Sequence, residues 1–325
     1  MARLRRVSLI VFLLLGLALP VTTAQAAPVR LTLLSGPIGG DWYSLGGAIG
    51  ETIKKSIPGA MVTVSTGGGI ANVLQVNADT AEIGLSQSML LDAALKGEEP
   101  YEGRGINSVC GLAYIQYLYQ SYFLVKEDVA IDSVEDLIAK KYPLRLALGV
   151  AGTTPELAAR RLFAEYGVSY KDIESWGGKL YFVSFAEAQT LMADGHVEAY
   201  IGPVLGAINQ MISLTKVKLL PWKEAALDAM VEKYSYLKKT LARDRYYFVT
   251  EDTPFMAEAN VLVIRSDVPE DVAYAIAKGI DENADMIRES GATYRNFDPA
   301  QMGADVGGPI HPGAARYYRE KGYIQ

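Results

Sequence analysis

The feature that most limits the fold is a regular alternation of short apolar runs with amphipathic stretches. Residues 30–34 and 61–65 are apolar runs of strand length, and the segment between them places Leu45, Ile49 and Ile53 on one helical stripe. Strands that alternate with helices build βα units, which form a largely parallel sheet covered by helices. The pattern therefore predicts an α/β protein.

The same alternation resumes in the second half of the chain. Residues 145–148 and 197–201 indicate further strands, and Pro155 with a threonine before it is a strong signal for the start of a helix. No low-complexity tract or long linker separates the two halves. The chain is therefore expected to form two α/β units.

A sequence similarity inside the chain suggests how the two units are connected. Residues 123–129 and 262–268 both have an apolar strand, a basic residue and then x-Asp-Val. Two such strands around an α/β segment would let the chain leave one domain and return to it. We therefore predict one lobe from residues 27–125 and 260–325 and an inserted lobe at 126–259. Chance similarity of two apolar strands is the alternative explanation on composition alone.

The N-terminus has the three parts of a secretory signal peptide. Arginines at positions 3, 5 and 6 precede an apolar run at residues 9–19, and Ala24-Gln25-Ala26 matches the pattern that signal peptidase cleaves. A transmembrane anchor is the alternative, but the apolar run is short and polar residues follow it. Cys110 is the only cysteine, so no lipid-anchor motif follows the run. We predict cleavage after Ala26 and a periplasmic location.

Composition excludes several classes of function. The net charge of −6 becomes more negative when the three arginines of residues 1–26 are removed, which argues against nucleic-acid partners and anionic membrane surfaces. Hydrophobic residues make up 50% and charged residues 21% of the chain, so disorder is also excluded. A single cysteine permits no internal disulfide. A compact monomer is expected.

Four loops share a design in which a strand ends, small or hydroxyl residues turn the chain, and a helix begins. They lie at residues 39–41, 66–69, 86–88 and 152–154. Such loops line the ligand crevice of open parallel sheets, and helix N-termini favour anions. Each loop alone could be an ordinary turn, and Thr66 and Thr154 could be simple N-caps. Their repetition in both predicted lobes favours a site that holds a carboxylate without an arginine.

Catalytic and metal-binding motifs are not found. The chain has no G-x-S-x-G elbow and no G-x-x-x-x-G-K-[ST] loop, and residues 36–40 do not match the dinucleotide-binding fingerprint. His196 is expected on the surface and His311 in a structural position, while Glu98 and Glu99 are expected to be solvated. We therefore predict no catalytic residue, no metal and no cofactor.

The four patches that carry these loops and the C-terminus resemble one family. Residues 39–46 are similar to G-G-T-Y-Y-P-L-G, residues 66–72 to T-G-G-S-x-x-N, residues 86–88 to a Q-S-D segment, and residues 311–318 to H-P-G-A-x-x-Y. In this order and spacing they resemble the TAXI-type solute receptors of tripartite ATP-independent periplasmic (TRAP) transporters.

The resemblance implies a type II periplasmic-binding-protein fold, in which crossover strands join two α/β lobes and a ligand cleft lies between them. It also implies delivery of a small-molecule solute, such as glutamate, glutamine or another organic acid, to membrane permease subunits driven by an ion gradient. Together, the loops and the resemblance give these candidate ligand-binding residues: Gly40, Asp41, Trp42, Tyr43, Thr66, Gly67, Gly68, Asn72, Ser86, Gln87, Gly152, Thr153 and Thr154.

Some positions depart from the family pattern close to the expected site. Asp41-Trp42 replaces Thr-Tyr, and Gly69 replaces a serine. We hypothesise that Asp41 caps its own helix or pairs with an ammonium group on the ligand. Trp42 and Tyr43 could form a wall of the pocket or fasten the helix to the core. The rival functions are a receptor for an ABC importer or a sensor, and an enzyme on the same two-lobed fold.

Overall fold

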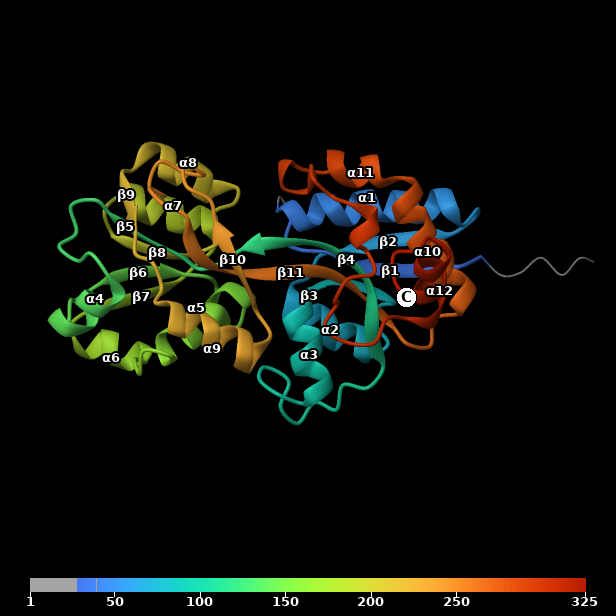
Figure 1. Ribbon diagram of the computed structural model, residues 1–325, viewed down its shortest axis with the longest axis horizontal. Coiled ribbons are helices and arrows are strands. Elements are labelled where there is room, and N and C mark those ends of the chain that lie inside the picture. Colours follow the sequence, from blue (N-terminus) through green and yellow to red (C-terminus); the bar gives the residue numbers. More distant parts are fainter. Residues whose placement is uncertain (1–27, 39) are drawn as a thin grey trace, which may run out of the picture.

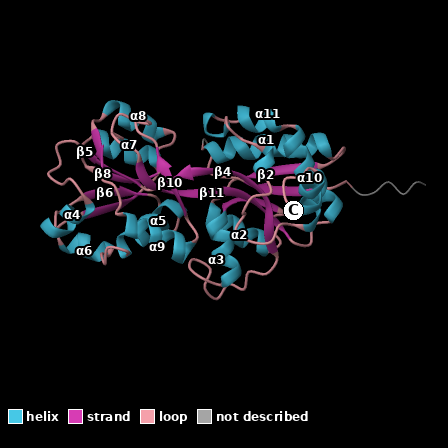
Figure 2. Cartoon of the chain, viewed as in Figure 1, coloured by secondary structure: helices cyan, strands magenta, loops and turns pink. Residues whose placement is uncertain are grey.

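The chain forms two lobes that lie side by side and share two long crossing strands, β4 and β11 (Figure 1). The computed structural model describes residues 28–38 and 40–325, so the predicted signal peptide at 1–26 lies outside the described residues. In both lobes a layer of strands is covered by helices on its two faces (Figure 2). The predicted α/β class is confirmed.

The sheet of the first lobe has the order β10-β11-β3-β1-β2, and β4 also pairs with β11. The first three strands of the chain are parallel, whereas β11 is antiparallel to β3, β4 and β10. The bounds are β1 (Arg30–Leu34), β2 (Met61–Ser65), β3 (Ile83–Gln87), β4 (Val109–Tyr119), β10 (Leu237–Leu241) and β11 (Thr253–Arg265).

Helices cover both faces of this first sheet. The predicted stripe of Leu45, Ile49 and Ile53 is fully buried and packs α1 against the sheet. With α1 (Asp41–Ser56) lie α10 (Glu270–Glu282), α11 (Ala284–Glu289) and α12 (Pro312–Glu320), together with the short turns η1 (Ala292–Tyr294) and η2 (Pro299–Gln301). The helices α2 (Gly69–Asn77) and α3 (Ser88–Lys96) cover the opposite face (Figure 1).

The sheet of the second lobe has the order β7-β6-β8-β5-β9. Its strands are β5 (Tyr122–Lys126), β6 (Arg145–Leu148), β7 (Lys179–Phe182), β8 (Ala199–Gly202) and β9 (Val217–Leu219). One face carries α4 (Val134–Lys140), α5 (Thr154–Ala164), α6 (Tyr170–Ser175) and α9 (Glu224–Tyr234), and the other carries α7 (Phe185–Ala193) and α8 (Ala207–Leu214) (Figure 1). Among residues 28–38 and 40–325, no helix is long and apolar enough to cross a membrane.

The chain passes between the lobes at Gln120 and Ser121, where β4 ends and β5 begins. Ser121 has a left-handed backbone with φ 58°, and its carbonyl accepts a 2.7 Å hydrogen bond from the Trp222 indole. The predicted boundary between residues 125 and 126 would leave most of β5 with the first lobe, whereas β5 pairs with β8 and β9 of the second sheet. The division into lobes stays a prediction, and the strand pairing favours a first boundary at Gln120.

Candidate functional site

The two lobes meet where predicted loops from each of them come together. The hydroxyl of Thr154, at the start of α5, donates a 3.5 Å hydrogen bond to the carboxamide oxygen of Gln87, at the end of β3. Both side chains are buried. The structure therefore brings together one predicted ligand residue from each lobe.

Gln87 lies at the centre of this junction. It is the N-cap residue of α3, and its side-chain nitrogen donates to Oε1 of Glu258 at 3.1 Å. A Cβ atom on Gly69 would lie only 2.1 Å from the Gln87 carboxamide oxygen. The glycine that replaces the family's serine therefore leaves room for Gln87 to lie against the start of α2.

Glu258 is a buried acid in the middle of β11 and is not among the residues predicted from the sequence. Its side chain is 2% exposed, and its Oε1 also accepts a 2.7 Å hydrogen bond from the Gln120 carboxamide. Its Oε2 has no hydrogen-bond partner among the described residues. Burial raises the pKa of the Glu258 carboxyl to about 7, although the two amide donors oppose that rise.

Other buried polar atoms near Glu258 also lack a partner in the described part of the chain. They are the carboxamide oxygen of Gln120, the hydroxyl of Ser121 and both side-chain atoms of Asn260, which pairs with Gln87 in the sheet register. We call Gln87, Gln120, Thr154, Glu258 and Asn260 the interlobe polar cluster. Buried polar groups in native proteins are normally satisfied, so such a cluster points to a function.

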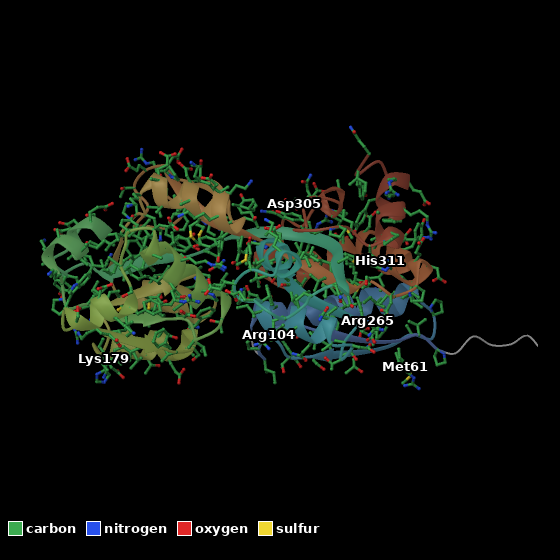
Figure 3. The ribbon with its side chains drawn as sticks, turned by 90° about the horizontal axis from the view of Figure 1, so that it is seen from below. Met61, Arg104, Lys179, Arg265, Asp305 and His311 are labelled. Atoms are coloured by element: carbon green, nitrogen blue, oxygen red, sulfur yellow. The ribbon has the colours of Figure 1, made fainter. Side chains whose placement is uncertain are left out.

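The cation nearest in sequence on β11 cannot neutralise Glu258. Arg265 lies at the other end of that strand, far from the junction (Figure 3), and it pairs with Asp79, Glu82 and Asp267. The position of Glu258 between the apolar residues 255–257 and Ala259 is the signal that could have identified it.

Asn72 has a framework position in the structure. It is fully buried, and its side-chain nitrogen donates to the carbonyls of Ser35 at 2.9 Å and Leu85 at 2.7 Å. Its side-chain oxygen accepts a 3.0 Å hydrogen bond from the amide of Gly68. Asn72 therefore holds the ends of β1 and β3 and the loop before α2 in place, and its amide is already used.

The remaining residues of the predicted loops divide into covered and accessible groups. Ser86 is buried and donates to the carbonyl of Gly69 at 3.0 Å. Thr66 is exposed, while Gly67 and Gly68 are half-buried. The N-cap of α2 is Gly68, so Thr66 is not the simple N-cap that was the alternative to a ligand-binding role.

The starts of the four helices near the junction differ in their electrostatics. None of their N-cap residues (Gly40, Gly68, Gln87 and Thr153) makes a side-chain cap. However, α1 carries an acid in its first turn, and so does α5, where the Glu156 carboxylate accepts from the amide of Gly152 at 3.1 Å. The first turns of α2 and α3 contain no acid. These two helix starts are therefore best suited to an anion.

The structure does not bring Asp41 into the interlobe polar cluster. Its carboxylate accepts a hydrogen bond from the hydroxyl of Thr293 in η1, so it ties α1 to the C-terminal segment. Trp42 packs on the core of the first lobe, which favours the fastening role over a pocket wall. Tyr43 is 37% exposed, and its side chain makes no hydrogen bond within the described residues.

An ion-pair group also links the lobes, and it corrects one expectation. Glu99 was expected to be solvated, but it accepts from Arg160 at 2.7 Å and Arg161 at 3.4 Å, both on α5. Partial burial acts to raise the pKa of Glu99, but the two arginines outweigh it and lower that pKa overall. This pairing fastens the loop after α3 to the second lobe.

Both histidines lie where they were predicted. His311 is buried and its Nδ1 accepts from the amide of Gly313, capping α12, while His196 is exposed. In the part of the chain that the structure describes, no group of three or more His, Cys, Asp or Glu side chains could hold a metal ion.

A groove of about 570 Å³ lies beside the junction, between α3, β10 and residues 301–308. Ser88, Asp92, Lys239 and Asp305 are among its lining residues, and Figure 3 shows Asp305 on the first lobe. The groove and the interlobe polar cluster are neighbours along the chain, because Ser88 follows Gln87 and the groove-lining Ala259 follows Glu258. The predicted loops line little of this groove.

The architecture is that of two-lobed periplasmic solute-binding proteins, as predicted. MatC from Rhodopseudomonas palustris with bound malate aligns with a TM-score of 0.53 and 12% identity over 92% of this chain and 97% of that chain. A TctC solute-binding protein from Polaromonas gives 0.49 and 18% over 93% and 100%. The alkanesulfonate-binding protein SsuA from Xanthomonas axonopodis pv. citri gives 0.46 and 13% over 91% and 85%.

At these identities the likeness to solved structures concerns the fold alone. The family is shown by a separate comparison, in which residues 33–322 match the NMT1-like family. The chain belongs to the NMT1-like family.

Replacing Asn72 with alanine should destabilise the protein. The change leaves the Gly68 amide and the Ser35 and Leu85 carbonyls without their partner, and one buried unsatisfied group costs roughly 1–3 kcal/mol. We expect urea denaturation to show a loss of more than about 2 kcal/mol in the free energy of unfolding. Gln75→Ala in the same helix is the control, because the Gln75 side chain makes no hydrogen bond within the described residues. Equal losses in the two variants would contradict the framework role.

The stability of the solute-free protein should depend on pH through Glu258. Its ordinary pKa of 4.5 rises to about 7 on folding, so the ionised form destabilises the folded state. This destabilisation is absent below about pH 4.5 and complete above about pH 7, where it reaches about 3 kcal/mol. The free energy of unfolding of Glu258→Gln, measured by urea denaturation, should therefore exceed that of the wild type by more at pH 8 than at pH 5.

The exposed acid Glu98 provides the control for this comparison, because Glu98→Gln removes the same charge outside the interlobe polar cluster. The free energy of unfolding of Glu98→Gln should change between pH 5 and pH 8 by the same amount as that of the wild type. If the free energy of unfolding of Glu258→Gln also changes with pH as that of the wild type does, the Glu258 carboxyl is not buried and unpaired in solution.

Proposed function

We propose that this protein is an exported receptor that binds a small solute between its two lobes. The observation that carries the proposal is the hydrogen bond between Thr154 and Gln87, which joins two predicted ligand-binding loops, one from each lobe. A solute at this junction contacts both lobes only when they are together, so binding and lobe closure support each other.

The geometry favours a solute with a carboxylate or a similar anionic group. The N-termini of α2 and α3 lie on the same side of the first sheet, carry no acid in their first turns and start at Gly68 and Gln87. Each helix start contributes only about 0.3–1 kcal/mol to an exposed anion, but the contribution grows when water is excluded. MatC, which shares this fold, holds malate, a dicarboxylate, and this is in line with an organic acid.

The delivery step of the proposal rests on the sequence resemblance. The patches at residues 39–46, 66–72, 86–88 and 311–318 resemble TAXI-type receptors, which pass their solute to the membrane subunits of a TRAP transporter. The signal-peptide pattern at residues 1–26 supports release into the periplasm. A gene for a multi-span permease next to the gene of this protein would support this pathway over an ABC importer or a sensor.

Native mass spectrometry of the purified protein tests the binding function. We expect an added mass from a retained small acid, which is released on denaturation and identified in the supernatant. Thr154→Val should weaken binding of that acid roughly five- to tenfold in calorimetry, because one hydrogen bond across the junction is lost. Thr250→Val, at an exposed position of the second lobe, is the control. Equal affinities of both variants and the wild type would exclude binding at this junction.

A further inference from the structure

The interlobe polar cluster contains an acid whose surroundings in the described residues lack a counter-charge. Oε1 of Glu258 accepts hydrogen bonds from the neutral carboxamides of Gln87 and Gln120, and Oε2 accepts none. The charged groups across the junction are already paired, because Arg161 bonds to both the side chain and the carbonyl of Glu99. No cation of the described chain is therefore in position to neutralise Glu258.

Three of the atoms without a partner around Glu258 are hydrogen-bond acceptors, while Nδ2 of Asn260 is a donor and the hydroxyl of the buried Tyr236 can donate or accept. The carboxamide oxygens of Gln120 and Asn260 accept no hydrogen bond from the described residues, nor does Oε2 of Glu258. Ser121 adds a hydroxyl at the same crossing between the lobes. A group that donates several N–H bonds and carries a positive charge would satisfy these three acceptors, whereas a second carboxylate would be repelled by Glu258.

The position of the acid argues against a purely structural role. A buried carboxylate without an ion-pair partner costs several kcal/mol, and a hydrophobic side chain at residue 258 would avoid that cost. The neighbours of Glu258 on β11, from Phe255 to Ala257 and at Ala259, are all buried and apolar. The acid thus lies among apolar residues of β11 and is linked through Gln87 to Thr154 of the second lobe.

We propose that Glu258 receives a protonated amine of the solute, so that the solute is an acid that also carries an ammonium group. This inference rests on the proposed function and makes it more specific. The anionic end would lie at the starts of α2 and α3, and the ammonium group would donate to Glu258, Gln120 and Asn260. Because Glu258 is 2% exposed, the amine reaches it only while the lobes are apart.

A matched set of probes tests this assignment by thermal shift and calorimetry. The probes are the twenty proteinogenic amino acids and, for each, the carboxylic acid of the same skeleton without the amine. We expect one or more amino acids to bind at least about tenfold more tightly than the amine-free partner, since a charge-assisted hydrogen bond is lost with the amine. Glu258→Gln should lower the affinity for that amino acid about tenfold or more, and it should not weaken binding of the amine-free acid, because the repulsion between the two carboxylates is removed.

Two controls keep the outcomes separate. Glu98→Gln removes a negative charge at an exposed position and should leave both affinities unchanged. The isosteric Glu258→Gln variant keeps an acceptor for Gln87 and Gln120, and circular dichroism will verify that it folds.

The inference is overturned if no amino acid binds, or if Glu258→Gln binds the amino acid as tightly as the wild type does. Tight binding of amine-free acids alone would overturn the amine assignment and leave the proposed solute-binding function in place. If the purified protein retains no small molecule and no probe of either kind binds, the proposed function fails as well.

Discussion

The antiparallel pairing of β4 with β11 is the constraint on which the two-lobed structure depends. The pairing runs from Val109–Arg265 to Tyr119–Ala257, with two register shifts between Asn260 and Val263, and forms a two-stranded ribbon that ends at the junction of the lobes. The amide of Gln120 still donates to the carbonyl of Met256 on β11, and β5 of the second sheet begins two residues later, so the last paired residues set the position of the second lobe. The polar residues near the end of the ribbon, Gln120 and Glu258, are therefore at the junction as a consequence of the pairing.

The junction combines apolar packing with polar groups that lack partners. One buried apolar cluster includes Leu90 of the first lobe, Leu157 of the second and Met256 of the crossing strand, and it stabilises contact between the lobes. The interlobe polar cluster has the opposite effect, because Glu258 is buried without a cation. A solute that supplies the missing positive charge would shift the equilibrium between separated and closed lobes toward the closed form. The chemistry of the site would in this way control the motion of the lobes.

Much of the fold could be predicted because it depends on patterns local to the sequence. The stripe at Leu45, Ile49 and Ile53 and the helix start at Pro155 follow from periodicity and from backbone preferences, and both are found in the structure. The crossing point could not be placed in this way, because β5 is an apolar strand that either sheet could accept. Its pairing with β8 and β9, which lie far along the chain, favours the second lobe.

The site was predictable only in part for a related reason. The loops with Gln87 and Thr154 could be found from strand and helix boundaries, since such loops converge at one edge of a sheet. What each polar side chain bonds to depends on contacts distant in sequence. Asn72 is a predicted ligand contact whose amide bonds to backbone groups in the structure. Glu258 has its partners at residues about 140 and 170 positions away.

Small-angle X-ray scattering tests most directly whether the lobes close around a solute. The radius of gyration of the protein freed of its solute should fall when the small molecule retained during purification is added back, and it should stay unchanged with a small molecule that does not bind. Tight binding with no change in the radius of gyration would show that the lobes do not move together when the solute binds. It would contradict the proposal that the two lobes close around the solute.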